Sequence, residues 1–136
     1  MTEKTETIEF HPIWLRIMYI VNIVLTLPMG LALLIAPTTV LSFFGFPTQE
    51  PIWAAGGYSV MVAVGIVAIA GLRSPLKFSP ILVFQILEKL IWLIVIIAPR
   101  AIAGTLPTFA MLLVAIYVPL TIGNLIAVPW KHIFAK

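Results

Sequence analysis

The amino-acid sequence predicts an all-α integral membrane protein: a four-helix up-down bundle, kinked at Pro28 and Pro119, with a short interfacial helix in the first loop. Hydrophobic residues make up 62% of the 136 residues and charged residues only 10%, whereas soluble domains have roughly 45–50% apolar and about 25% charged residues. So small a soluble domain could not bury that excess in a core. We therefore expect lipid to surround most of the surface.

The apolar residues fall into four stretches, each long enough to cross a bilayer. The predicted membrane domain covers residues 12–130, with spans at 12–36, 52–72, 80–98 and 107–128. Residues 1–11 are expected to form a polar, solvent-exposed N-terminal tail, and residues 131–136 a cytoplasmic C-terminal tail.

Prolines set the course of the first and fourth spans. Pro12 suits the first position of a helix, where its missing N–H would have no partner anyway. Pro28 and Pro119 lie inside spans, and a proline there removes a helical hydrogen bond and bends the helix. We expect Pro119 to free the carbonyl of Ala115.

Three connections join the spans. Residues 40–46 in the first loop are apolar but too short to cross, so they are expected to lie along the interface as a short helix. Phe43, Phe44 and Phe46 within them are interpreted as an interfacial anchor. Tight turns at 73–79 and 99–105 are expected to join neighbouring antiparallel helices.

Small residues at four-residue spacing mark one face of the second span. Ala55, Ser59 and Ala63 fall on this face, and small side chains let membrane helices approach closely. We expect this face to serve ordinary helix packing.

Basic residues near the span ends predict the orientation, because lysine and arginine are enriched on the cytoplasmic side. Arg100 is the only one expected on the far side. Both termini should therefore be cytoplasmic. The six expected on the cytoplasmic side are Lys4, Arg16, Arg73, Lys77, Lys131 and Lys136.

The third span carries polar residues at its centre, where a charged side chain costs about 2.5–3.5 kcal/mol or more. Counting 1.5 Å per residue from the cytoplasmic ends puts them in one layer with polar residues of the first and fourth spans. The predicted buried polar cluster consists of Glu88, Lys89, Gln85, Asn22, Tyr19, Arg16, Thr121 and Asn124.

Glu88 and Lys89 are sequence neighbours and point about 100° apart on a helix, so they are expected to find different partners. Lys89 shares a face with Gln85 and could also donate to the freed Ala115 carbonyl. Glu88 could meet Arg16, Tyr19 or Asn22.

Other chemistry is not indicated. The chain has no cysteine, which excludes disulfides and thiolate ligands. His11 and His132 are expected near the membrane surface rather than inside it. No catalytic set, phosphate-binding loop or paired carboxylates are present, so no catalytic residue, metal or cofactor is expected.

The chain resembles the DoxX-like group of small bacterial membrane proteins over about residues 13–128. The similar features are LLIAP at 33–37, FGFP at 44–47, Gly56 with Gly57 at the start of the second span, and Lys89 in the third. The resemblance implies the four-helix fold and a bacterial inner membrane. The group's name reflects an association with a quinol oxidase, which implies an accessory role, because this chain has no redox ligands.

Three functions fit the sequence. The first is a non-catalytic membrane subunit or scaffold that docks laterally against a larger complex or against itself. The second is a small proton- or cation-coupled transporter or channel that uses Glu88, which a water-filled path to Glu88 would favour. The third is a binding protein or enzyme for a lipophilic ligand such as a quinone or isoprenoid, which a lipid-sized pocket with a side opening would favour.

Overall fold

The computed structural model describes residues 10–135, and every regular element in that range is a helix. The all-α prediction is therefore confirmed. Most of the predicted tail 1–11, and Lys136 at the other end, lie outside the described residues. The helices in chain order are α1 (Pro12–Ile35), α2 (Pro37–Phe43), α3 (Pro51–Arg73), α4 (Pro75–Phe78), α5 (Pro80–Ile91), the π-helix η1 (Trp92–Ile97), α6 (Ala98–Ile102), α7 (Thr108–Ala127) and α8 (Trp130–Ile133).

Four of these helical stretches are long and apolar enough to cross a membrane. They are α1, α3, the continuous run Pro75–Ile102 that contains α4 to α6, and α7, with mean hydropathies of 2.0 to 2.4. The predicted number of long apolar helices is thus correct. A short helix is present in the first loop as α2, but it covers residues 37–43 rather than the expected 40–46.

The third long helix extends further than predicted at both ends. Residues 75–78 and 98–102 are helical, so the turns at 73–79 and 99–105 are shorter than expected. Pro75 starts a helix without losing a hydrogen bond, because it occupies the first turn. Before Pro99 the helix widens into η1, where the Ala98 N–H donates to the Leu93 carbonyl, five residues back.

Pro28 and Pro119 lie inside α1 and α7, as their positions in the sequence require. Both helices continue through the proline. A bend at either residue stays a prediction.

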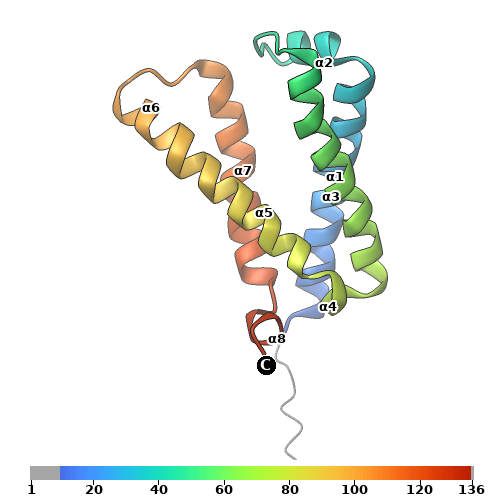
Figure 1. Ribbon diagram of the computed structural model, residues 1–136. Helices are drawn as coiled ribbons and strands as arrows, with labels where there is room; N and C mark the ends of the chain where they lie inside the picture. The colour runs from blue at the N-terminus through green and yellow to red at the C-terminus, as the bar shows by residue number, and fades with distance from the viewer. Residues whose placement is uncertain (1–9, 136) are drawn as a thin grey trace, which may run out of the picture.

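The long helices pack mainly as two pairs. α1 packs along α3, and α5 packs against α7, whereas fewer contacts join α1 to α7 and α3 to α5. Figure 1 shows the pairs close together at the end that holds α4 and α8, here called the basal end, and diverging toward the distal end with α2 and α6.

Glycines allow the close approach of α1 and α3. A Cβ added at Gly65 would lie 2.6 Å from the Cβ of Leu27, and one added at Gly71 would overlap the ring of Tyr19. The contact face of α3 therefore includes Gly65, Ala68 and Gly71, all of them buried.

The small-residue face expected from the sequence is not the packing face. Ser59 and Ala63 are exposed, and Ala55 is only partly buried. The expectation was wrong because the tightest contact with α1 is set by the absence of a side chain at the glycines, nearer the basal end.

The main core lies at the basal end, where the two pairs meet. Its largest fully buried members are Leu15, Tyr19 and Leu82, and Leu120 and Ala127 of α7 belong to the same cluster. This core holds the two helix pairs together at the basal end only.

Replacing Gly65 by alanine should destabilise the protein, because the new methyl group must push Leu27 away. Overpacking of this kind costs about 1–3 kcal/mol. The matched control is Gly56→Ala on the same helix, where an added Cβ meets nothing within 4 Å. Alanine there should be neutral or stabilise by about 0.5–1 kcal/mol, because glycine is the weaker helix former. Thermal unfolding in detergent measures both, and equal melting temperatures for the two variants would contradict the packing described.

Candidate functional site

A cavity of about 720 Å³ lies between the two helix pairs. All four long helices line it, together with α2 and the segment that follows α2. Most lining side chains are apolar, among them Met29, Met61 and Leu113. The lining residues with polar groups are Thr26, Gln49, Tyr58, Gln85, Glu88, Lys89 and Tyr117.

Aromatic side chains form the distal part of the cavity. Phe46, which follows α2, meets Phe109 at the start of α7 with ring centroids 5.5 Å apart, edge to face. Phe44 also lines the cavity, whereas Phe43 points outward and is 82% exposed. Two of the three phenylalanines interpreted as an interfacial anchor therefore belong to the cavity wall.

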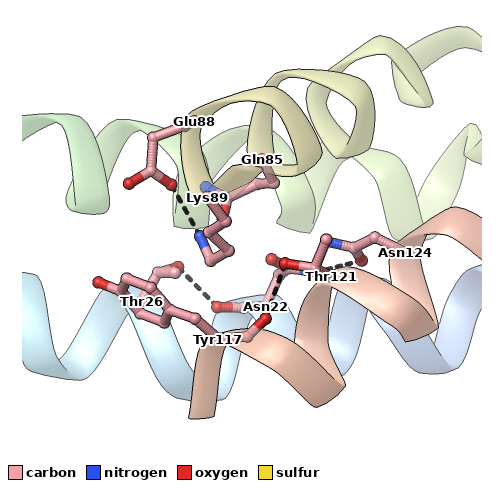
Figure 2. A network of polar contacts seen from close by, with 8 residues as sticks. All are labelled: Asn22, Thr26, Gln85, Glu88, Lys89, Tyr117, Thr121 and Asn124. Atoms are coloured by element: carbon pink, nitrogen blue, oxygen red, sulfur yellow. Dashed lines mark hydrogen bonds and ion pairs between the residues drawn. The ribbon is translucent and has the colours of Figure 1, made fainter. Parts of the chain in front are cut away.

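The polar groups gather around Lys89. Its side chain is buried, and its ammonium donates to Gln85 Oε1 and to Glu88 Oε2, the latter at 2.9 Å. The ammonium also lies over the ring of Tyr117, 4.8 Å from the centroid. Figure 2 shows Lys89 extending from α5 toward Tyr117 of α7. Its three protons thus have three partners.

The expectation that Glu88 and Lys89 would not pair was wrong. The two side chains form an ion pair, with Glu88 42% exposed and Lys89 only 4%. Neighbouring residues start in different directions on a helix, but both side chains are long enough to bend together. Lys89 bonds to these α5 residues rather than to the Ala115 carbonyl.

Arg16 does not reach Glu88. It is exposed at the basal end, where it lines a second cavity of about 350 Å³ with Lys77 and Ser74. Tyr19 does not reach Glu88 either, because its hydroxyl donates to the Pro75 carbonyl at 2.6 Å. Arginine at a helix end can direct its charge outward at low cost, which explains why it leaves the predicted cluster.

A separate polar contact joins α1 to α7. Asn22 Nδ2 donates to Asn124 Oδ1 at 3.1 Å and to the Met18 carbonyl at 2.7 Å, and both asparagines are fully buried. Thr121, on the same face of α7, bonds to the Tyr117 carbonyl. This contact lies beside the cavity rather than in its lining.

The eight residues of the predicted cluster therefore divide into separate groups. Gln85, Glu88 and Lys89 line the cavity, Asn22 and Asn124 join α1 to α7 beside Thr121, Tyr19 holds α4, and Arg16 lies at the basal surface. Four polar residues of the cavity lining were missed: Thr26, Gln49, Tyr58 and Tyr117. For Gln49 and Tyr58 the sequence gives no comparable signal, but Thr26 and Tyr117 could have been found. The available signal was helical spacing, because Thr26 is four residues after Asn22 and Tyr117 four before Thr121.

In the comparisons with known proteins, no protein-family model, no curated protein and no solved structure matches this chain. The resemblance to the DoxX-like group therefore stays a prediction.

Removing the charge of Glu88 should destabilise the protein more than removing that of Lys89. Glu88→Gln leaves a buried ammonium without its counter-charge, and breaking a buried pair from one side costs about 3–5 kcal/mol. The half-exposed position of Glu88 moves the expected cost to the low end of that range. Lys89→Met instead leaves a lone carboxylate that is 42% exposed, whereas the lone ammonium is only 4% exposed, so the carboxylate is the less costly of the two charges to leave unpaired.

The double variant Glu88→Gln/Lys89→Met should recover part of the loss, because no charge remains unpaired. Melting temperatures in detergent test all three variants. Additive effects of the two single substitutions would show that the two side chains are not coupled.

Proposed function

We propose that the chain is a small, non-catalytic integral membrane protein that binds a lipophilic molecule in the cavity between its two helix pairs. The size and lining of this cavity carry the proposal. Its volume of about 720 Å³ lies within the roughly 300–1,000 Å³ typical of ligand pockets. An apolar wall with a few convergent polar groups is also typical of such pockets.

The membrane setting is supported by the outer surface of the helices. Large apolar side chains are exposed along them, including Ile66 at 57%, Ile94 at 65% and Ile122 at 52%. A water-exposed protein rarely leaves so much apolar surface uncovered. We infer that the four long helices cross the bilayer alternately, as an up-down bundle, with α2 at the interface.

The orientation is supported by the distribution of charge. Arg16 and Lys77 line one cavity at the basal end, and α8 with Lys131 lies at the same end (Figure 1). Arg100 belongs to α6 at the distal end. By the positive-inside rule the basal end, and with it both termini, is cytoplasmic. A bacterial inner membrane is supported by the DoxX-like resemblance.

The ion pair argues against the use of Glu88 as a proton or cation carrier. A carboxylate that carries protons must become neutral at one stage, and one that carries another cation must have its charge available to that ion, but Lys89 compensates the charge of Glu88 at 2.9 Å. In the described range 10–135 the only other acidic residue is Glu50, which caps α3. A lateral docking role with other subunits or a second copy explains neither the cavity nor its polar groups, so it stays a prediction.

Single cysteines test the orientation, and the chain has no native cysteine to interfere. Lys77→Cys and Lys131→Cys should react with a membrane-impermeant maleimide only after the cytoplasmic side is opened. Arg100→Cys should react in intact cells or spheroplasts. Labelling of positions 77 and 100 from the same side would contradict the alternating course of the helices.

Filling the cavity should displace its ligand. Gly57 lines the cavity, its neighbour Gly56 does not, and an added Cβ meets nothing within 4 Å at either position. Gly57→Phe should therefore reduce the amount of lipophilic molecule that copurifies with the protein, measured by native mass spectrometry from mild detergent. Gly56→Phe places the same ring outside the cavity and should leave that amount unchanged. Equal occupancy in the two variants would count against a ligand in this cavity.

A further inference from the structure

The two charged side chains of the cavity differ in their exposure and in their hydrogen bonds. Lys89 and Glu88 both line the cavity, but Lys89 is only 4% exposed whereas Glu88 is 42% exposed. One carboxylate oxygen, Oε2, accepts from Lys89. The other, Oε1, points away from Lys89 (Figure 2). Within residues 10–135 no side chain or backbone N–H donates to Glu88 Oε1.

The Lys89 ammonium has no proton left to donate to a ligand. The three protons of the Lys89 ammonium face Gln85 Oε1, Glu88 Oε2 and the ring of Tyr117. An anionic head group would have to displace one of these partners. Among the described residues, the atom of this pair that is left without a hydrogen-bond partner is thus an acceptor, Glu88 Oε1.

The position of the pair selects against a charged head group. Glu88 lies near the middle of the helical run Pro75–Ile102, roughly 20 Å from either end at 1.5 Å per residue. A charge carried to that depth loses its hydration, which is costly. The ion pair is neutral as a whole, so it does not compensate a further charge of either sign.

We propose that the ligand is a lipophile that ends in a neutral hydroxyl group, of the class of long-chain or isoprenoid alcohols. The hydroxyl donates to Glu88 Oε1, and the hydrocarbon chain extends between the helix pairs along Met29, Met61 and Leu113 toward the phenylalanines of the distal end. A hydroxyl fits where a carboxylate does not, because it supplies the missing donor without adding a charge. This inference rests on the proposed function and names the polar chemistry of its ligand.

Four probes with the same chain test it: 1-hexadecanol, methyl hexadecyl ether, hexadecanoic acid and hexadecylamine. The ether keeps the oxygen but lacks the proton. Binding to the full-length protein in non-ionic detergent is measured by native mass spectrometry over a range of probe concentrations. Hexadecanol should bind about tenfold or more tightly than the ether, as expected for a hydrogen bond to a charged acceptor. The acid and the amine should both bind more weakly than the alcohol.

A variant isolates the role of Glu88. Glu88→Leu/Lys89→Met removes the acceptor without leaving an unpaired ammonium. In this variant the advantage of the alcohol over the ether should disappear, and the melting temperature of the variant in detergent checks that it is folded. An alcohol advantage that persists in this variant would overturn the assignment to Glu88.

The remaining outcomes are distinct. If the ether, the acid or the amine binds as tightly as the alcohol, a neutral donor is not what the site selects, and this inference fails while the proposed lipophile binding stands. If none of the four probes binds, the proposed function fails with it.

Discussion

The crossing of α1 and α7 at the basal end is the contact on which the rest of the structure depends. A Cβ added at Gly123 would lie 2.8 Å from the sulfur of Met18, and Trp14 donates to the Gly123 carbonyl at 3.1 Å. Asn22 and Asn124 meet beside this point. Because the pairs are fastened here and in the adjoining core, their divergence toward the distal end leaves the space that becomes the cavity.

A buried ammonium is the second determinant of the site. Lys89 cannot be left without partners in an apolar surrounding, and α5 supplies two of them itself, at positions one and four residues before the lysine. Helix α7 contributes only the face of an aromatic ring. The hydrogen bonds of the Lys89 ammonium are therefore made almost entirely within α5. The ammonium needs no partner from the pair formed by α1 and α3. Divergence of the pairs at this depth then costs little electrostatic energy.

The sequence predicts much of this fold because composition and proline positions determine it. Four apolar runs require four helices, and Pro12, Pro51 and Pro80 stand at the first positions of α1, α3 and α5. Estimating depth in the membrane from the rise per residue also identifies residues that are buried in the structure, such as Asn22, Gln85 and Asn124. The direction of Glu88 could not be predicted, because side-chain length lets neighbours pair despite their angular separation. The cavity depends on how far two helix pairs diverge, which no local pattern encodes.

The π-helix η1 places an extra residue in one turn of an otherwise regular helix. Residues after it are rotated by about 100° relative to an uninterrupted α-helix, so the face that carries Gln85 and Lys89 does not continue into α6. An alignment of this chain with a relative that lacks the wide turn would need a single-residue gap in the middle of an apolar helix. Alignment methods that allow no gap inside such a helix would misplace every residue from 98 to the end of α6 by one position. This part of the chain would then look unrelated, although only the direction in which its side chains point had changed.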